Sequence, residues 1–424
     1  MKSLKFIKIK DFIPCLISAI LLIFSFPPFN LWILAWFSFL PLFLALNNKT
    51  FLKSFFLGFF TGFIFFINIL HWIIHVTLLG YILLTIYLAI YFGVFGIFFK
   101  ILQNRPNLLT LGLACSWIIL EYLRSHMGNI SFSWASLSHS QTSNLAFIQI
   151  ADIGGSYLVS FILILINIFI WQIIKKQKKN IIYLFILIIL IYSYGFFKLK
   201  EPVSKKTIRI SIIQPDIAQE LKRNGNENFI LSKTFSLAQD SLKNKPNLII
   251  WPEASFPGYW DIDLLLQEKV LDYIRQAKIN LLLGSARIEK NEEEYFFNSA
   301  ILLSPGKPSQ IYNKIRLVPF GEYIPLRKIF GFLETIVFIG DFTKGKEYKI
   351  FTIPIDKDKV QFSVLICFED TFSDLARSFV QNGAEFLINI TNDAWFKKTT
   401  APYQHMQSSI LRAIENRRSL VRSA

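Results

Sequence analysis

The sequence contains few cysteines, few histidines and few charged residues. Of its 424 residues, 3 are Cys and 5 are His, and charged residues account for 17%. Cys15 and Cys115 fall within long apolar runs, so Cys367 is the one thiol of the second half of the chain and has no disulfide partner there. No set of Cys and His with metal-ligand spacing accompanies it. The sequence therefore predicts neither a disulfide-rich domain nor a metal site, and it directs attention to Cys367 as a thiol available for chemistry.

Apolar residues, by contrast, are abundant. Hydrophobic residues make up 53% of the chain, 44 residues are Phe, and the mean hydropathy is +0.43, which is too apolar for an ordinary soluble protein. Most of the apolar runs in the first half approach the roughly 20 residues that span a bilayer core. We predict a membrane domain of about seven helices within residues 1–200, from runs at 12–26, 31–46, 54–76, 78–99, 108–123, 156–174 and 181–197.

The first two apolar runs are short and leave alternatives open. Phe26-Pro27-Pro28-Phe29-Asn30 lies between them and is typical of a tight turn, so these runs can also form a kinked hairpin. A basic start before an apolar run is also a feature of cleavable signal peptides, but no small-residue cleavage site precedes the next run.

Basic residues before the first run and in every second loop after it predict the orientation in the membrane. These residues are Lys2, Lys5, Lys8, Lys10, Lys49, Lys53, Lys100, Arg105, Lys175, Lys176, Lys178 and Lys179. The other loops carry almost none, Arg124 being the exception. We therefore predict a cytoplasmic N-terminus, and seven crossings place everything after about residue 200 on the far side.

The net charge of +16 follows mainly from this topology. Residues 1–200 hold 15 Lys and Arg against 3 acidic residues, whereas residues 201–424 hold 30 against 26. Because the membrane arrangement explains the excess of basic residues, we predict no nucleic-acid partner.

From Thr207 onwards, short β-branched runs alternate with helical patterns. Strands are predicted at 207–214, 248–251, 280–284, 300–303, 362–366 and 385–390, and helices at 228–243, 264–277, 371–382 and 403–418. This alternation predicts that residues 201–424 form a layered α/β domain.

Three chemically useful side chains follow apolar, strand-like runs of this second half. Cys367 follows Ser363–Ile366, Glu253 follows Trp251-Pro252, and Lys314 precedes a turn that also carries Glu322. A thiol nucleophile needs a base and a group that stabilises the oxyanion formed when it attacks a carbonyl. A lone cysteine is more often simply a small hydrophobic residue, so the prediction depends on the whole set and its order.

The residues around these three positions resemble a known pattern. Trp-Pro-Glu at 251–253, Asn-Lys at 313–314 with Leu-Val-Pro-Phe-Gly-Glu-Tyr-Ile-Pro at 317–325, and Ile-Cys-Phe-Glu at 366–369 are similar to the Glu-Lys-Cys pattern of the nitrilase superfamily, in the form carried by the apolipoprotein N-acyltransferase family. The nine-residue string is the most specific part, and the resemblance covers nearly the whole chain. It implies a multi-span α-helical membrane bundle followed by an α-β-β-α sandwich.

The resemblance also implies roles for individual residues. Glu253 corresponds to the general base, Lys314 to the group that stabilises the oxyanion and Cys367 to the nucleophile. Supporting positions correspond to Glu322, Glu369 and Phe368, with the two carboxylates orienting Lys314 and the acceptor amine. Trp395 and Phe396 are candidates for lining an acyl pocket.

The implied reaction is a ping-pong acyl transfer in the bacterial inner membrane, with the catalytic domain on the periplasmic side. Cys367 takes an acyl chain from a membrane phospholipid, typically phosphatidylethanolamine, as a thioester. The chain then passes to the α-amino group of a diacylglyceryl-cysteine at the N-terminus of an apolipoprotein. No metal or diffusible cofactor is required.

The resemblance fails at the C-terminus and leaves other functions open. The family continues into further strands and a last membrane helix, whereas this sequence stops at Ala424, so we expect a truncated sandwich of lowered stability. One alternative is a membrane-anchored amidase or nitrilase that acts on C–N bonds, and another is an inactive relic. A transporter finds little support, because Glu121 is the main ionisable residue near a predicted span.

Overall fold

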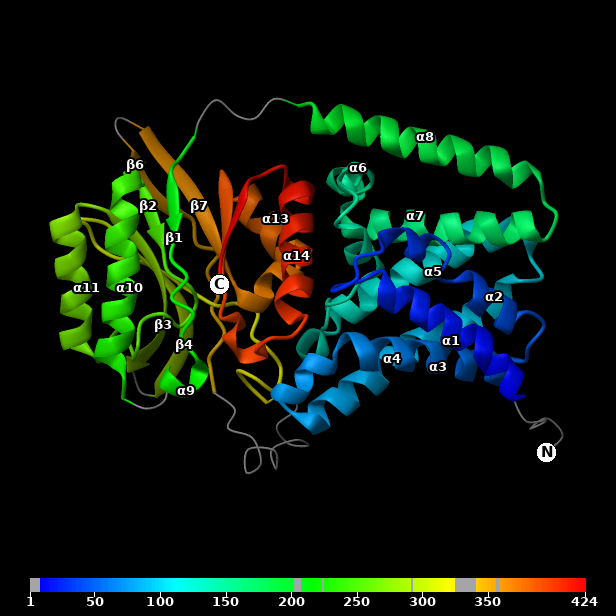
Figure 1. Cartoon of the computed structure of the whole chain (residues 1–424), viewed down its shortest axis with the longest axis horizontal. Helices are drawn as coiled ribbons and strands as arrows, with labels where there is room; N and C mark the ends of the chain where they lie inside the picture. The colour runs from blue at the N-terminus through cyan, green and yellow to red at the C-terminus, as the bar shows by residue number, and fades with distance from the viewer. Residues whose placement is uncertain (1–7, 202–206, 223–224, 291–292, 325–340, 356–357) are drawn as a thin grey trace. The chain divides into compact units, whose positions relative to one another are not determined.

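The computed structural model describes residues 8–201, 207–222, 225–290, 293–324, 341–355 and 358–424. The predictions that involve Lys2, Lys5 and Pro325 lie outside these residues. The chain divides into two compact units (Figure 1). The helical unit comprises residues 1–201 and 398–415, and the sandwich unit comprises residues 202–397 and 416–424.

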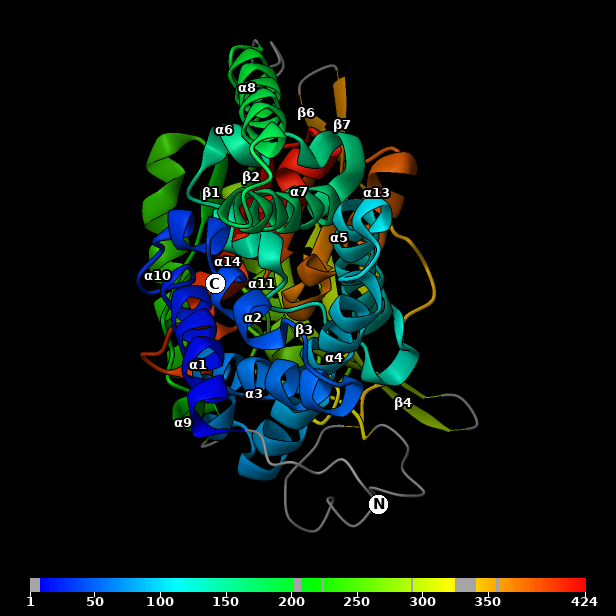
Figure 2. The same cartoon turned by 90° about the vertical axis from the view of Figure 1, so that its right-hand side faces the viewer.

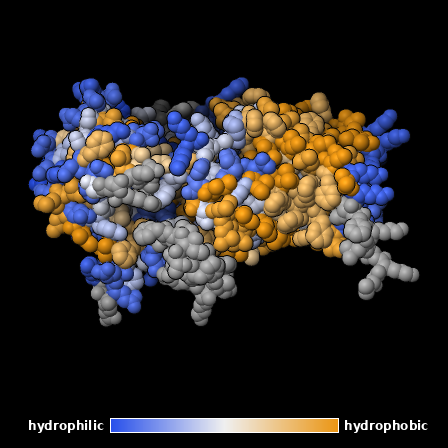
Figure 3. Space-filling model, turned by 60° about the horizontal axis from the view of Figure 1, so that its bottom comes forward, coloured by the Kyte–Doolittle hydropathy of each residue, from blue (hydrophilic) through white to orange (hydrophobic). Residues whose placement is uncertain are grey.

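Five helices of the helical unit are long and apolar enough to cross a membrane. They are α3 Phe51–Ile69, α4 Leu78–Leu102, α5 Pro106–His126, α7 Ala151–Ile174 and α8 Lys179–Leu199. Short helices connect some of them: η2 His71–His75, η3 Gly128–Ile130, η4 Leu137–Gln141 and α6 Leu145–Ile148. Their exposed side chains are largely apolar, and Figure 3 shows the resulting hydrophobic surface in orange. These helices explain the apolar composition of the first half of the chain.

The first two predicted spans form shorter elements. The first is α1 Ile9–Phe24, and the second is divided between η1 Trp32–Trp36 and α2 Leu40–Leu46. Pro27 and Pro28 follow the end of α1, and Pro41 lies in the first turn of α2, a position that tolerates a missing backbone N–H. The described residues therefore contain five helices of spanning length where the sequence predicted about seven, and the number of membrane crossings stays a prediction.

Helices α3 and α4 are neighbours, and glycine allows them to approach closely (Figure 2). A Cβ atom at Gly58 would collide with the backbone carbonyl of Phe92, and one at Gly96 would collide with the carbonyl of Ser54. Small residues serve the same purpose in many membrane helix pairs, where backbones pack without large side chains between them.

Two β-sheets form the sandwich unit. The first has the order β1-β2-β3-β4-β5, with parallel pairing from β1 to β3 and antiparallel pairing from β3 to β5. Its strands are β1 Ile210–Ile212, β2 Leu248–Ile250, β3 Asn280–Lys290, β4 Glu294–Leu303 and β5 Gln310–Asn313. The second sheet has the order β6-β7-β8-β9, and only the β6–β7 pair is antiparallel. Its strands are β6 Phe351–Ile355, β7 Asp358–Ile366, β8 Phe386–Ile390 and β9 Leu420–Ser423.

Helices cover the outer faces of the two sheets. Helices α10 Glu227–Ser241 and α11 Leu264–Ala277 lie on the first sheet over a core that includes Trp251, Leu281 and Ile301. Helix α13 Ser373–Gln381 packs against β7 of the second sheet. The remaining short helices are α9 Gln219–Lys222, η5 Leu242–Asn244, η7 Cys367–Thr371 and η8 Asp393–Phe396. The order helix, sheet, sheet, helix confirms the predicted fold class.

The predicted strands and helices of the second half all occur, and three further strands were not predicted. Strands β5 and β9 have only four residues each, and β6 contains Pro354, a residue that argues against a strand in a sequence. The predicted helix at 403–418 occurs as α14, Ala401–Asn416, and nearly all of it belongs to the helical unit.

Candidate active site

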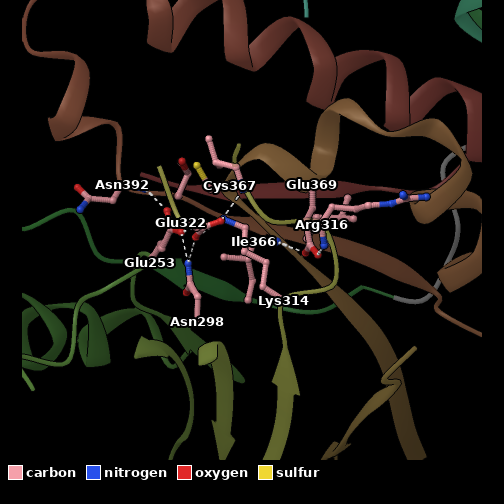
Figure 4. A network of polar contacts seen from close by, with 12 residues as sticks. Glu253, Asn298, Lys314, Arg316, Glu322, Ile366, Cys367, Glu369 and Asn392 are labelled. Carbon is pink, nitrogen blue, oxygen red and sulfur yellow. Dashed lines mark hydrogen bonds and ion pairs between the residues drawn. The ribbon is translucent and has the colours of Figure 1, made fainter. Parts of the chain in front are cut away.

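Three strand ends bring Glu253, Lys314 and Cys367 into one site (Figure 4). Glu253 follows β2 and Lys314 follows β5, both in the first sheet, whereas Cys367 follows β7 in the second sheet. The sequence predicted this set from the order of the residues and from their resemblance to a known pattern. The structure places the three side chains together at the ends of two different sheets.

The Lys314 ammonium group is the centre of the polar network. Only 1% of the side chain is exposed, and its Nζ atom donates to Oε1 of Glu322 at 2.8 Å and to Oε1 of Glu253 at 3.4 Å. Burial alone would lower the pKa of Lys314, but the negative charges of Glu322 and Glu253 outweigh burial and raise it. Lys314 therefore remains a cation between two carboxylates.

Two asparagines hold the Glu253 carboxylate, which is itself buried. Nδ2 of Asn298 donates to Oε1 of Glu253 at 2.8 Å and to Oε1 of Glu322 at 2.7 Å. The backbone N–H of Asn392 donates to Oε2 of Glu253 at 3.0 Å. The sequence analysis missed Asn298, although a polar side chain within the apolar strand β4 is a signal that could have identified it.

Cys367 occupies a strained turn at the end of β7. Its φ angle is +50°, a left-handed conformation that is costly for a residue other than glycine. Nδ2 of Asn389 donates to the Cys367 carbonyl at 3.1 Å and ties this turn to β8. A sharp turn directly after a strand presents the side chain away from the sheet, as a nucleophile requires.

The surroundings of the Cys367 thiol favour its protonated form. The residue is only partly exposed to solvent. This burial, together with the negative charge of Glu253, raises the pKa of Cys367 well above its ordinary value, and the positive charge of Lys314 opposes the change. Nucleophilic attack by Cys367 therefore requires a base that removes the proton.

Glu369 links the Lys314 segment to the cysteine turn. Its carboxylate is fully buried and accepts hydrogen bonds from the backbone N–H groups of Ile315 at 2.7 Å, Arg316 at 2.9 Å and Ile366 at 2.8 Å. The Tyr312 hydroxyl donates to it at 2.8 Å. These contacts suit a positioning residue that fixes the backbone on both sides of the site.

Replacing Glu369 with glutamine is expected to destabilise the sandwich unit by about 2 to 4 kcal/mol. The amide nitrogen of glutamine cannot accept a hydrogen bond, so buried backbone N–H groups lose their acceptor. Thermal unfolding of the purified full chain measures the change. The exposed Glu347, replaced in the same way, serves as the control and should change stability by less than about 0.5 kcal/mol.

The effect of Glu369→Gln should also depend on pH. Burial raises the pKa of Glu369 from 4.5 to about 7, although the hydrogen bonds from the N–H groups of Arg316 and Ile366 act to lower it. A raised carboxyl pKa stabilises the folded wild type below pH 4.5, and this contribution is lost as the pH rises through 7. The difference in the free energy of unfolding between the wild type and Glu369→Gln should therefore become smaller as the pH rises from 4.5 to 7. An increase of this difference would contradict the assigned pKa.

The aromatic residues predicted for this region lie in different surroundings. Phe368 is buried, with its ring 5.1 Å from that of Phe372, so it contributes to the packing beneath the cysteine turn. Trp395 and Phe396 lie in η8, and 44% of Trp395 is exposed. Their place in an acyl pocket stays a prediction. Among the described residues, no cluster of His, Cys, Asp and Glu suits a metal ion.

Comparison with known proteins identifies similarities over nearly the full length. Residues 18–169 match the family described as apolipoprotein N-acyltransferase N-terminal domain, and residues 209–424 match carbon-nitrogen hydrolase. The apolipoprotein N-acyltransferase of Geobacter metallireducens is 34% identical over 443 residues, which cover 98% of this chain and 84% of the relative. The apolipoprotein N-acyltransferase of Chlorobaculum tepidum is 30% identical over 456 residues, which cover 98% of this chain and 85% of that relative.

Solved structures give a more distant similarity. The NitN amidase from Nesterenkonia sp. AN1 aligns with 17% identity and a TM-score of 0.37, over 51% of this chain and 78% of the amidase. This likeness is too distant to bear on the activity.

Proposed function

This chain belongs to the apolipoprotein N-acyltransferase family of multi-pass membrane enzymes, and from that premise we propose the reaction and the residues that perform it. The acceptor is the α-amino group of a diacylglyceryl-cysteine at the N-terminus of an apolipoprotein. The acyl donor is a membrane phospholipid, most simply phosphatidylethanolamine. The observation that carries the proposal is the network in which Lys314 lies between Glu322 and Glu253, beside Cys367.

In the first half-reaction, Sγ of Cys367 attacks the carbonyl carbon of a phospholipid ester. Glu253 accepts the thiol proton as the C–S bond forms, because the raised pKa of Cys367 leaves little thiolate at neutral pH. The Lys314 ammonium stabilises the negative charge on the carbonyl oxygen. The ester C–O bond then breaks, Glu253 returns the proton to the departing glycerol oxygen, and a lysophospholipid leaves a thioester on Cys367.

In the second half-reaction, the α-amino group of the acceptor attacks the thioester carbonyl. Glu253 accepts a proton from the amine, and Lys314 again stabilises the oxyanion. The C–S bond breaks, the Cys367 sulfur regains a proton, and an amide-linked acyl chain remains on the lipoprotein. The thiol proton leaves with the lysophospholipid and a proton from the amine replaces it on Cys367, so Glu253, Lys314 and Cys367 all end the cycle in their starting states.

We also propose that the N-terminus is cytoplasmic and the sandwich unit periplasmic. Lys49 and Lys53 precede or open α3, Lys100 lies in the last turn of α4 and Arg105 directly precedes α5, as the positive-inside rule requires of cytoplasmic ends. Such an orientation exposes the site to lipoproteins that have already been exported. Both substrates remain anchored in lipid, which accounts for the union of an acyl-transfer unit with membrane helices.

The test is acylation of a defined lipopeptide by the purified full chain in phosphatidylethanolamine vesicles. A diacylglyceryl-cysteinyl peptide with a free α-amine should gain the mass of one fatty-acyl chain, with one lysophospholipid released for each acylation. The same lipopeptide with an acetylated amine is the control and should gain nothing. Cleavage of soluble amides without lipopeptide acylation would instead support an amidase, and a folded chain without either activity would support an inactive relic.

A further inference from the structure

Helix α5 carries three buried polar side chains on one face, outside the candidate active site. Trp117, Glu121 and Arg124 follow a spacing of four and then three residues, which places them above one another on an α-helix. Their exposed fractions are 6%, 4% and 3%. Charged side chains are rare inside membrane helices and generally mark a functional site.

Each of the three residues has a buried polar atom without a partner: Nε1 of Trp117, Oε2 of Glu121 and Nε of Arg124. Other atoms of the two charged groups are hydrogen-bonded. Oε1 of Glu121 accepts from the Leu137 N–H at 2.7 Å, and Nη2 of Arg124 donates to Ser136 Oγ at 2.9 Å. Such unsatisfied atoms are costly in a protein interior.

The charge of Arg124 is opposed by the nearby Glu121 carboxylate, but the two groups do not form a direct ion pair. Its guanidinium lies over the Phe66 ring, 5.7 Å from the centroid. Among the residues that the structure describes, no carboxylate lies within ion-pair distance of it. Because Glu121 is not in direct contact with it, the Arg124 guanidinium can still accept an anionic ligand, and guanidinium groups are especially suited to phosphate.

All three side chains line one cavity of the helical unit. The rest of its wall is largely aromatic and aliphatic, contributed by Leu22, Phe26, Phe65, Phe66, Tyr91 and Phe92 among others. Its empty space, counted out to its open side, is about 400 Å³. The enclosed part is narrow and admits only a group of about the size of a phosphate oxygen or a hydroxyl, so the rest of a ligand lies on the open side of the cavity.

We propose that this cavity binds the phosphodiester head group of a membrane lipid that also carries an N–H or O–H donor. Nε–H of Arg124 and Nε1–H of Trp117 donate to phosphate oxygens, and Oε2 of Glu121 accepts from the ammonium or hydroxyl of the head group. The apolar wall contacts the glycerol and acyl parts. All the residues that line the cavity belong to the helical unit.

The donor requirement distinguishes this site from general lipid adhesion. Phosphatidylethanolamine and phosphatidylglycerol carry a donor in the head group, whereas phosphatidylcholine carries none. Native mass spectrometry of the purified full chain, supplied with equal amounts of the three lipids with identical acyl chains, should show about tenfold or greater retention of the first two over phosphatidylcholine. A parallel sample with inorganic phosphate or O-phosphoethanolamine should show no retention, because neither fills the apolar wall.

Matched variants test which residues are responsible for lipid retention. Trp117→Phe removes the N–H but keeps an aromatic ring, and it should lower retention several-fold. Trp171→Phe is its control, because Nε1 of Trp171 is also buried without a partner but Trp171 lies on α7 and does not line the cavity. Glu121→Gln should reduce the preference over phosphatidylcholine, and Arg124→Gln should abolish retention of all three lipids.

Retention is measured only on variants whose thermal unfolding remains cooperative. If Arg124→Gln does not fold, Trp117→Phe and Glu121→Gln decide the question. Equal retention of the three lipids by the wild type, retention of a soluble phosphate in their place, or an equal loss in Trp171→Phe would each overturn the proposal. Because lipid retention does not require acyl transfer, the result is independent of the activity at Cys367.

Discussion

Replacing Cys367 with serine is expected to abolish the thioester acyl-enzyme and to lower acyl transfer by about 10³-fold or more. The side chain follows β7 in a left-handed turn beside Glu253 and Lys314, and the hydroxyl of serine is a much weaker nucleophile. Intact mass spectrometry after incubation with phosphatidylethanolamine vesicles measures the intermediate directly. The wild type should gain the mass of one fatty-acyl chain and lose it again in neutral hydroxylamine.

Cys115→Ser provides the matched control for this experiment. Cys115 is an exposed thiol on α5 of the helical unit, so the same substitution there should leave acylation unchanged. A hydroxylamine-sensitive adduct that survives in Cys367→Ser would assign the nucleophile to another residue. The absence of any adduct on folded wild-type protein in the presence of phospholipid would contradict the proposed acyltransferase mechanism.

The sequence was sufficient to predict the ends of two of the strands on which the chemistry depends. Glu253 and Cys367 follow runs that were predicted as strands and form β2 and β7, whereas β5, which precedes Lys314, was not predicted. Local patterns determine such positions because a buried strand must be apolar and must end at a polar or turn residue. The pattern does not determine which strands become neighbours, and the resemblance to a known family supplied that information.

Asn298 illustrates what the sequence left undetermined at the site. It lies within β4, and its side chain contacts Glu253, which is 45 residues earlier in the chain, and Glu322, which is 24 residues later. Both contacts depend on the packing of strands that are distant in sequence. A polar residue in an apolar strand indicates that a buried partner is needed, but it does not identify the partner.

In the helical unit, too, the sequence did not identify the surroundings of charged residues. In the sequence, Glu121 and Arg124 were residues near the end of a predicted span, and neither was given a partner. The structure buries both beside Trp117 in one cavity. Helical spacing places them on one face of α5, but the cavity also involves α1, α3, α4 and the segment around Leu137, and local patterns cannot identify these neighbours.

Replacing Glu253 with glutamine is expected to lower the rate of thioester formation by about 10² to 10⁴-fold. Glutamine has nearly the same shape and can still accept from Asn298 or Asn392 through its carbonyl oxygen, but it cannot take the proton from Cys367. The variant therefore removes the base with little change of shape. The time course of the acyl-enzyme mass measures the effect.

The same variant should change the pH dependence of thiol alkylation in the direction that favours thiolate. Burial and the negative charge of Glu253 both raise the pKa of Cys367, so removal of that charge should lower it. Alkylation of Cys367 by iodoacetamide, followed by mass spectrometry, should then reach its half-maximal rate at a lower pH than in the wild type. Thiolate becomes more available while acyl transfer falls, a combination that simple loss of structure does not produce.

Glu322→Gln is the matched control for this second measurement. It also removes a carboxylate that contacts Lys314, but the charge of Glu322 is not among the main influences on the pKa of Cys367. Its alkylation profile should therefore remain closer to that of the wild type.

A Glu253→Gln variant that forms the thioester at the wild-type rate would remove Glu253 from the role of base, because the buried and protonated thiol requires one. A shift of the alkylation profile to higher pH would show that the Glu253 carboxylate does not act on the thiol through its charge.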